Sequence, residues 1–422
     1  MHVCIIGAGV IGTTTAWQFA RQGARVTLLD ASAGAGLGTS LANGGQLSYS
    51  YVAPLADPGV FPHLPKWLLD GGSPLRFRPA LDPQQWRWCL RFLRACRAET
   101  VRETTAAMLT LSYLSRDTLH QWMADTPVDF HHQTNGKLIA YRSAALLDKA
   151  RKLVAYQASQ GSQQVILSRQ QCTDLEPALD GLGDRLAGAI YTPGEEVGDC
   201  HLFTQGLFNA LEQQSGASLR MNARVARLRR EHGRIIAAEL DNGEAIQADQ
   251  FVLAAGLHSR QLLRSLGDDA MLYGLRGYSL SVPLSSPSAN APPPKAPSIS
   301  ITDYERRIVY APIGDVLRIA AMVDMGGRGP AINQRRIALL KQQVNDTFPG
   351  LPLQQAGVWA GERPATPEGK PIIGRSKAAD NLWLNIGHGA LGFTLSCGSA
   401  VLLESMVSGR SSPIAPAPFA PH

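Results

Sequence analysis

None of the six cysteines belongs to a CxxC pair; they are scattered at positions 4, 89, 96, 172, 200 and 397 of the 422-residue chain. Dispersed cysteines in a chain of this length predict buried free thiols rather than a disulfide framework or a zinc site. We therefore expect no metal in the protein.

The sequence also lacks a long apolar run, because no stretch approaches the ~20 apolar residues of a membrane span. Met1 and His2 lead directly into a strand-like segment, without the basic and apolar regions of a signal peptide. These absences predict a cytoplasmic protein, either soluble or peripheral on the inner face of the cell membrane.

A recognisable nucleic-acid-binding module is absent as well, although the net charge is +6 and the isoelectric point is about 9.0. A basic balance also suits an anionic ligand or a membrane surface, and without such a module we expect no nucleic-acid partner. What the chain does contain, 45% hydrophobic and 18% charged residues, is typical of a globular protein of two or three lobes.

The first thirty residues contain the elements of a dinucleotide-binding unit in the required order. Residues 3–6 form a short apolar run, and a glycine turn, a helical pattern, a second apolar run and an acid follow. The residues expected to bind the cofactor here are Gly7, Gly9, Val10, Ile11, Gly12 and Asp30.

Each glycine has a separate task in such a unit. Gly7 lets the chain turn sharply off the strand, Gly9 lets the backbone approach a pyrophosphate, and Gly12 lets the helix pack against the sheet. The helix N-terminus offers N–H groups and a partial positive charge to phosphates. The carboxylate of Asp30 can accept hydrogen bonds from ribose hydroxyls.

Small residues recur further along the chain. Residues 31–46 form a loop that suits close wrapping of a cofactor, and a buried strand ends at Ala255 and Gly256. Strand-like runs between about residues 278 and 322 predict a broad antiparallel sheet. A strand at 381–386, a glycine loop and a helix suggest that the C-terminal part completes the cofactor domain.

Residues 61–97 are basic and rich in tryptophan, with Lys66-Trp67 followed by Trp86-Arg87-Trp88. This composition fits a patch that contacts a membrane surface. It also fits an amphipathic helix whose aromatic side packs in the core.

Six stretches together closely resemble bacterial D-amino-acid dehydrogenases, which belong to the wider glycine oxidase and D-amino acid oxidase fold family. They are the glycine turn, TSLANGGQ at 39–46, GDCHLFTQ at 198–205, GYSL at 277–280, RPATP at 363–367 and GHGALG at 387–392. The resemblance covers nearly the whole chain, and the motifs occur in the same order.

The resemblance implies an α/β fold in which a Rossmann-like FAD-binding domain is joined to a second, α+β substrate domain built on a broad antiparallel sheet. The FAD-binding domain would comprise residues 1–50, 198–265 and 360–422. The substrate domain would comprise residues 51–197 and 266–359. A plain NAD dehydrogenase would leave the C-terminal glycine segments unexplained.

The resemblance also assigns residues to the site. Arg363 would bind the substrate carboxylate, Tyr278 would add a phenol hydrogen bond, Tyr51 would contribute to the pocket or lid, and His388 would touch the flavin. The further residues implied in FAD binding are Thr39, Ser40, Asn43, Gly44, Gln46, Val225, Ala255, Gly256, Gly361, Gly387, Gly389, Gly392 and Thr394.

The implied reaction is FAD-dependent oxidation of a D-amino acid to an imine, which water hydrolyses to a 2-oxo acid and ammonia, with electrons passed to a quinone or another carrier. Alternatives are a dehydrogenase of D-proline or hydroxy-D-proline, an oxygen-using oxidase, and a flavin subunit that requires partner subunits. Two departures put the substrate in question: residues 48–51 read Ser-Tyr-Ser-Tyr in place of Ser-Pro-Gly-Tyr, and Asp324 replaces a glutamate.

Overall fold

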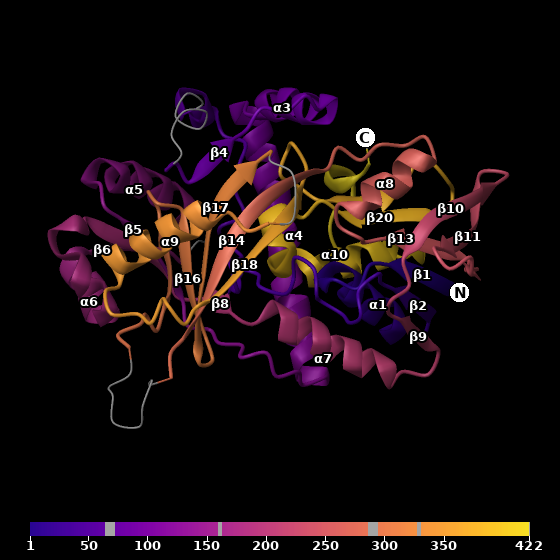
Figure 1. Ribbon diagram of the computed structural model, residues 1–422, viewed down its shortest axis with the longest axis horizontal. Coiled ribbons are helices and arrows are strands. Elements are labelled where there is room, and N and C mark those ends of the chain that lie inside the picture. Colours follow the sequence, from indigo (N-terminus) through magenta and orange to yellow (C-terminus); the bar gives the residue numbers. More distant parts are fainter. Residues whose placement is uncertain (64–71, 159–162, 286–293, 327–330, 422) are drawn as a thin grey trace.

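The chain forms two large sheets in a computed structural model that describes residues 1–63, 72–158, 163–285, 294–326 and 331–421. Figure 1 shows the two sheets toward opposite ends of the long axis, with both chain ends on the side of the first sheet. Residues 66–69 of the basic segment lie outside the described residues.

The first sheet has six strands, of which five run parallel. The antiparallel strand β19 forms one edge. In spatial order the strands are β19 (Ile372–Arg375), β20 (Leu382–Ile386), β13 (Gln250–Leu253), β1 (His2–Ile6), β2 (Arg25–Leu29) and β9 (Ala217–Arg220). Strands from three distant parts of the sequence therefore build one sheet.

Both faces of this sheet are covered, as a buried parallel sheet requires. In β1, Val3 and Ile5 pack into one hydrophobic cluster, while Cys4 and Ile6 pack into another on the opposite face. Each such fully buried aliphatic side chain contributes about 1.5–3 kcal/mol to folding. The helices on this side are α1 (Val10–Arg21), α7 (Cys200–Glu212), α8 (His258–Ser265) and α10 (Gly392–Val407).

Smaller sheets complete this half of the molecule. Strands β10 (Val225–Glu231), β11 (Arg234–Leu240) and β12 (Ala245–Ile246) form an antiparallel sheet. Strands β3 (Gln46–Leu47) and β8 (Glu196–Val197) pair where the chain leaves and re-enters the first half.

The second large sheet has nine strands, antiparallel except for the pairs β15–β5 and β17–β4. In spatial order the strands are β18 (Gly357–Ala365), β14 (Tyr273–Pro283), β17 (Val316–Met325), β16 (Ile308–Ile313), β15 (Ser300–Asp303), β5 (Lys137–Tyr141), β7 (Gly188–Thr192) and β6 (Val165–Ser168), with β4 (Leu75–Phe77) beside β17. The predicted combination of a Rossmann-like sheet and a broad, mainly antiparallel sheet is confirmed.

Helices accompany the nine-stranded sheet. They are α3 (Pro83–Ala95), α4 (Ala98–Asp125), α5 (Ala144–Ala158), α6 (Arg169–Leu175) and α9 (Gln334–Thr347). Asp82 caps α3 by accepting a hydrogen bond from the N–H of Gln84, and Asn333 caps α9 in the same way through Arg335. The predicted free thiols are also confirmed, because all six cysteines are unpaired and five are buried.

One segment differs from the expectation about apolar runs. Gly389–Val407 is helical and apolar enough, by length and composition, to cross a membrane. However, 67% of its apolar window is buried inside the protein, and α10 packs against α1 and α4. Buried polar residues such as Thr394, Ser396 and Ser399 interrupt the apolar run in the sequence, so the segment is read as a core helix.

Candidate active site

The glycine turn has the geometry that the sequence predicts. Gly7 has a φ of +110°, a value that L side chains rarely adopt. A Cβ on Gly12 would lie 1.7 Å from the carbonyl oxygen of Gly7, so only glycine lets α1 pack this close to the strand. A Cβ on Gly9 would meet only the Ser40 hydroxyl, at 3.6 Å. Packing within the protein therefore does not require glycine at position 9.

The N-terminus of α1 suits a bound anion. Its first turn includes Val10 and Ile11, contains no acidic residue, and has Gly9 at the N-cap without a side-chain cap. Such an end leaves N–H groups and a partial positive charge available. The N–H of Val10 donates to the hydroxyl of Ser40 at 3.1 Å, which places the loop that follows β2 beside the turn.

Asp30 ends β2 next to this turn. Its two carboxylate oxygens accept hydrogen bonds from the N–H groups of Ala8 (2.6 Å) and Ser32 (2.7 Å). Each oxygen keeps a further lone pair for a ribose hydroxyl. The N–H of Ala223 donates to the Asp30 carbonyl, so Val225, two residues later, begins β10 near the acid. The Val225 carbonyl is hydrogen-bonded to Nε2 of His258 at 3.1 Å.

The segment after β13 lies against the turn. A Cβ on Gly7 would lie 2.6 Å from the carbonyl oxygen of Ala254 and 2.7 Å from the Cα of Ala255. The N–H of Ala255 donates to the hydroxyl of Ser259, and Gly256 has a positive φ of +55°. Ala255 and Gly256 are thus placed beside the cofactor turn, as the sequence predicts.

Residues 39–46 pass between the two large sheets. The hydroxyl of Thr39 donates to the Glu362 carbonyl on β18, and the hydroxyl of Ser279 on β14 donates to the Ala42 carbonyl. Nη1 of Arg318 on β17 donates to the Asn43 carbonyl. Three strands of the nine-stranded sheet therefore hold the loop through hydrogen bonds to its backbone and to the Thr39 side chain.

The same loop also meets the C-terminal glycine segment. The side chain of Asn43 accepts from the N–H of Gly45, and a Cβ on Gly44 would lie 3.3 Å from the Cβ of Ala320. The carbonyl of Gln46 is 3.4 Å from the hydroxyl of Thr394 in the first turn of α10. Positions 39–46 and 394 are consequently brought together, as predicted.

The C-terminal glycine loop turns tightly before α10. Gly387 and Gly389 have φ values of +83° and +56°, and Gly392 begins α10. His388 between them is buried and forms an isolated bridge with Ala365 at the end of β18. Burial lowers the pKa of His388 to about 3, so the imidazole is neutral at physiological pH.

His388 leaves one ring nitrogen without a hydrogen-bond partner. Its Nε2 is 3.0 Å from the hydroxyl of Ser399. Its Nδ1 is buried, and the part of the chain that the structure describes supplies no partner for it. An unpaired buried nitrogen costs free energy, and a bound ligand could satisfy it.

Arg363 extends over a strip of glycines. In the β14–β18 ladder Gly277 pairs with Gly361, and the neighbouring pair on the same face is Leu275 with Arg363. A Cβ on Gly277 would lie 2.3 Å from the Arg363 guanidinium, and one on Gly361 would lie 1.9 Å from the Trp359 indole. The two glycines thus make room for the side chains of Arg363 and Trp359 on one face.

A β-bulge supplies the protein contact of Arg363. Met322 and Val323 on β17 both oppose the single residue Gly277, between the pairs Arg276–Asp324 and Tyr278–Ala321. Met322 has a φ of +65°, which costs about 1–3 kcal/mol for a residue that is not glycine. Its carbonyl accepts from Nη1 of Arg363 at 3.3 Å, so the strained bulge directs an acceptor at the arginine.

Arg363 has no carboxylate partner among the described residues, and burial lowers the pKa of its guanidinium. A desolvated cation is costly unless an anion pairs with it. Its planar donor fork matches a carboxylate in a bidentate pair. The arrangement therefore fits an external anion of this type.

The side chain of Tyr278 lies on the opposite face of the sheet from that of Arg363. Successive residues of a strand point to opposite faces, and Tyr278 follows Gly277, which shares the face of Arg363. The Tyr278 hydroxyl instead donates to Oδ2 of Asp324 at 2.9 Å, and Arg76 and Arg336 pair with the same carboxylate. Burial and the Asp324 charge raise the pKa of Tyr278 to about 12. The expected phenol contact with a substrate held by Arg363 is inconsistent with this placement.

Tyr51 contacts strands β5 and β7 of the nine-stranded sheet. Its hydroxyl lies 2.6 Å from that of Thr192 on β7, and the ammonium of Lys137 lies 4.7 Å from its ring centroid. Burial raises the pKa of Tyr51 to about 12 and lowers that of Lys137 to about 8. These contacts hold Tyr51 in place, and its role in a pocket or lid stays a prediction.

The unusual Ser-Tyr-Ser-Tyr segment is held by side chains along its length. Ser48 accepts from the Lys137 ammonium, the Tyr49 hydroxyl donates to Glu196, and the N–H of Ser50 donates to Glu195. Hydrogen bonds to β5, β7 and β8 thus replace the stiffness that a proline would give this segment.

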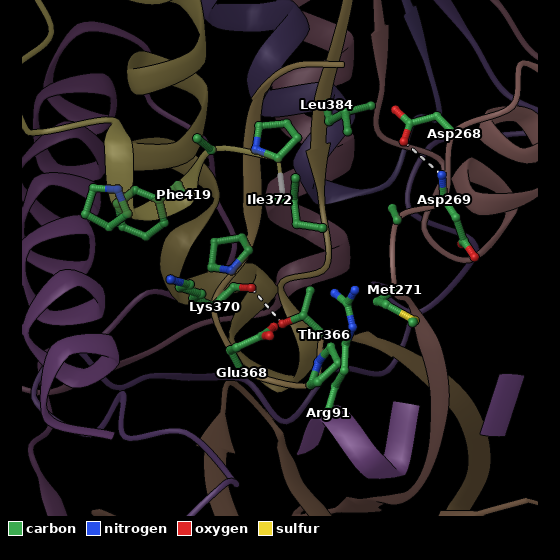
Figure 2. Close-up of a pocket in the computed structure, with 16 residues that line it drawn as sticks. Arg91, Asp268, Asp269, Met271, Thr366, Glu368, Lys370, Ile372, Leu384 and Phe419 are labelled. Carbon is green, nitrogen blue, oxygen red and sulfur yellow. Dashed lines mark hydrogen bonds between the residues drawn. The ribbon is translucent and has the colours of Figure 1, made fainter. Parts of the chain in front are cut away.

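Two surface hollows lie apart from the glycine turns. One, shown in Figure 2, has a volume of about 40 Å³ and lies between Arg91 of α3, the turn from Thr366 to Lys370, and Phe419 near the C-terminus. The other, of about 160 Å³, includes Arg276 and Asp324 on the Tyr278 face. Both are smaller than the ~300 Å³ typical of ligand pockets, so neither is a dinucleotide site.

The residues around the glycine turn fit FAD. The space beside Gly9 and the uncapped end of α1 suit the phosphates, and Asp30 suits the ribose. The unpaired Nδ1 of His388 and the loops 39–46 and 387–394 lie where the two sheets meet, which suits the flavin end. The sequence analysis did not single out Trp359, which packs over Gly361, or Met322, whose carbonyl contacts Arg363. The alternate positions 359, 361 and 363 place Trp359 on the same strand face as Arg363. No sequence pattern indicates the bulge at Met322.

Comparisons with known proteins agree with this geometry. The chain matches the family described as FAD dependent oxidoreductase over residues 2–406. It is 46% identical over 426 residues to D-amino acid dehydrogenase 2 of Ralstonia nicotianae, covering 100% of this chain and 99% of that protein. It is 47% identical over 411 residues to D-amino acid dehydrogenase 2 of Pseudomonas aeruginosa, covering 97% and 95%.

Solved structures share the fold at low identity. Glycine oxidase from Geobacillus kaustophilus superposes with a TM-score of 0.75 at 19% identity, covering 99% of this chain and 97% of that one. L-proline dehydrogenase from P. horikoshii superposes with a TM-score of 0.76 at 12% identity, covering 100% and 96%.

We expect Gly9→Ala to fold normally but to bind FAD at least about tenfold more weakly, a loss of about 1.4 kcal/mol or more. The added methyl has room in the protein alone and would occupy the space that a pyrophosphate needs. Flavin content after purification and titration of the apoprotein with FAD would measure the loss. Gly194→Ala, where a Cβ meets nothing within 4 Å, is the control; full FAD occupancy in Gly9→Ala would contradict the assignment.

Proposed function

The chain belongs to the family of FAD-dependent oxidoreductases, and from this premise we propose that it is a D-amino-acid dehydrogenase. The proteins named D-amino acid dehydrogenase 2 match it along nearly the whole length at 46–47% identity. The structural observation that carries the proposal is Arg363, a half-buried cation beside two glycines, with no carboxylate partner among the described residues.

The reaction oxidises the bond between the substrate Cα and its amino nitrogen. Bound FAD supplies the acceptor for the hydride that leaves Cα. Loss of this hydride and of a proton from nitrogen leaves an imine, and water then converts the imine to a 2-oxo acid and ammonia. The tasks of the protein are to bind and orient the substrate and to control charge around it.

Arg363 binds and orients the substrate through its carboxylate. Two parallel N–H donors fix the carboxylate plane, and the Met322 carbonyl keeps the guanidinium from rotating away. With one end of the substrate fixed, Cα is held at a defined distance from the flavin end of the site.

The histidine of the C-terminal glycine loop, which bridges to Ala365 on the strand that carries Arg363, is neutral. His388 carries no charge at physiological pH because burial lowers its pKa to about 3. A neutral His388 does not compete with Arg363 for the substrate carboxylate, and no dedicated base is required if the amine binds uncharged.

We assign the FAD-binding domain to residues 1–50, 198–265 and the C-terminal part of the chain, as the sequence suggests. One boundary is changed. The expected start of the third segment at residue 360 falls inside β18 (Gly357–Ala365), which belongs to the nine-stranded sheet. The third segment therefore begins after Ala365, and the substrate domain keeps 51–197 and 266–365.

The electron acceptor in this proposal is a quinone reached at the cytoplasmic face of a membrane. Helix α3 at the edge of the molecule (Figure 1) supports this. Trp88 and Phe92 pack in the core, whereas Trp86 and Leu90 are 47% and 58% exposed. The inner face of the helix therefore packs in the core, and the proposal assigns membrane contact to its outer face.

The outer face of α3 combines these apolar side chains with basic ones. The exposed basic residues on it are Arg87, Arg91 and Arg94. Apolar rings and aliphatic chains flanked by arginines suit the interface of an anionic lipid surface, where a lipid-soluble quinone is available.

Mixing the purified flavoprotein anaerobically with D-amino acids should bleach the flavin absorbance near about 450 nm, whereas the L-enantiomers should leave it unchanged. D-proline and hydroxy-D-proline in the panel separate a cyclic imino acid from a primary amine, since only the latter releases ammonia. Bleaching by none of these compounds would contradict the proposed function, and peroxide formed in proportion to substrate in air would identify an oxidase instead.

Arg363→Lys should lower kcat/KM for a D-amino acid by about tenfold to a hundredfold, mainly through KM, because lysine cannot form the bidentate pair. FAD content should not change. Steady-state kinetics with a dye acceptor would measure the effect. The control is Arg375→Lys, an exposed arginine that lies over the Trp383 ring; equal kinetics in both variants would remove Arg363 from the substrate site.

Replacing Trp86 and Leu90 together by serine should lower binding to anionic vesicles by about tenfold or more, because two exposed apolar groups leave the interface. Activity with a soluble dye should stay unchanged, while activity with quinone in vesicles falls. Cosedimentation would measure binding. The control replaces Tyr113 and Leu175, each 38% exposed, by serine; an equal loss in the control would contradict a specific role of α3.

A further inference from the structure

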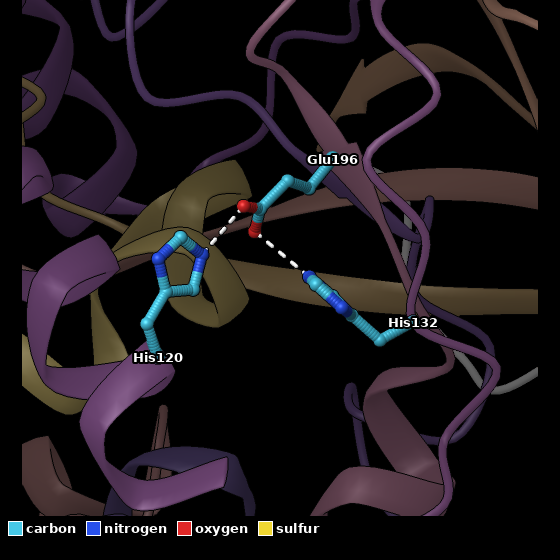
Figure 3. Close-up of side chains that lie close together, drawn as sticks. All are labelled: His120, His132 and Glu196. Carbon is cyan, nitrogen blue, oxygen red and sulfur yellow. Dashed lines mark hydrogen bonds and ion pairs between the residues drawn. The ribbon is translucent and has the colours of Figure 1, made fainter. Parts of the chain in front are cut away.

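A cluster of three metal-ligating side chains lies outside the site described above. It consists of His120 from the C-terminal part of α4, His132 from the segment after it, and Glu196 on β8. Figure 3 shows the two imidazoles approaching the same carboxylate from different elements. One donor atom from each residue lies within 4.8 Å of the others.

Each imidazole contacts a different oxygen of Glu196. Nε2 of His120 lies 2.6 Å from Oε1, and Nε2 of His132 lies 3.0 Å from Oε2. The Tyr49 hydroxyl also donates to Oε2 at 2.9 Å. Among the described residues this carboxylate has no Lys or Arg in an ion pair, although its side chain is only 2% exposed. A buried carboxylate in such surroundings favours a positive charge nearby.

We propose that His120, His132 and Glu196 bind one divalent transition-metal ion of the zinc class. Two imidazole nitrogens and one carboxylate oxygen form a donor set that zinc accepts. Neighbouring donors around a tetrahedral zinc ion are about 3.3 Å apart, from bond lengths near 2.0–2.1 Å. The His–Glu spacings of 2.6 and 3.0 Å are shorter than this, and all three donor atoms lie within 4.8 Å of one another, so shifts on the order of 1–2 Å would admit the ion.

The backbone preorganises two of the three ligands. Gln133 and Val197 exchange hydrogen bonds of 3.0 and 2.9 Å in an isolated antiparallel bridge, and these residues directly follow His132 and Glu196. The bridge therefore holds the two ligands at diagonal positions on one face before any ion binds, which reduces the cost of ordering them. The Tyr49 hydroxyl donates to the Glu196 carboxylate, and hydrogen bonds of this kind orient ligands in metal sites.

The remaining side of the site is open to water. The His120 side chain is 46% exposed and that of His132 is 17% exposed, so a water molecule can complete the tetrahedron. A bound ion would join α4, the 126–136 segment and β8. Because β8 pairs with β3, it would also brace the end of the loop that continues from residue 46.

The test is equilibrium dialysis of the chelator-treated, FAD-loaded protein against Zn²⁺. We expect one ion per chain, at least tenfold weaker binding in His120→Asn, and a melting temperature that rises with Zn²⁺ in the wild type but not in that variant. His120 is exposed, so its replacement should not prevent folding, which Glu196→Gln could.

The matched control is His131→Asn, which removes a neighbouring histidine that is outside the cluster. Asparagine tolerates the positive φ of +55° at this position, and zinc binding should be unchanged. Failure to bind Zn²⁺ stoichiometrically, or equal binding by His120→Asn and the wild type, would overturn the proposal and leave a hydrogen-bonded triad.

Discussion

The structure depends on how residues 39–46 are held between the two large sheets. The hydrogen bonds that hold this loop include those from Thr39 to β18, from Ser279 and Arg318 to its backbone, and from Thr394 to its end. Each contributes only about 0.5–1.5 kcal/mol. Because their partners come from β14, β17, β18 and α10, which are far apart in the sequence, together they set the position of the six-stranded sheet against the nine-stranded sheet.

Several features of the nine-stranded sheet around Arg363 are locally unfavourable for folding. Gly277 and Gly361 give up side-chain packing, Met322 adopts a left-handed backbone, and Arg363 carries a charge into a desolvated position. The opposite face compensates, since Tyr278, Arg76 and Arg336 all satisfy Asp324. On one face of the sheet the charges of Asp324 and the two arginines are thus paired, whereas on the other Arg363 has no carboxylate partner among the described residues.

The sequence was sufficient wherever function depends on neighbours in the chain. The glycine turn, Asp30 and the C-terminal glycine loop could be predicted because each task follows from spacing within one unit. Residues 277 and 278 show the limit: one lies beside Arg363, and its neighbour points away, which requires knowledge of strand register. His120, His132 and Glu196 are 12 and 64 residues apart, so no local motif could reveal their contact. The bulge at Met322 is likewise a property of the pairing of two strands.

The segment 48–51 links these parts of the molecule. A proline would stiffen this segment through its ring. Here two adjacent glutamates hold it instead: Glu195, just before β8, accepts from the N–H of Ser50, and Glu196 on β8 accepts from the Tyr49 hydroxyl. Glu196 also faces His120 and His132. Its two oxygens therefore contact the Tyr49 hydroxyl and both imidazoles. The segment 48–51 and the cluster of His120, His132 and Glu196 thus share one carboxylate.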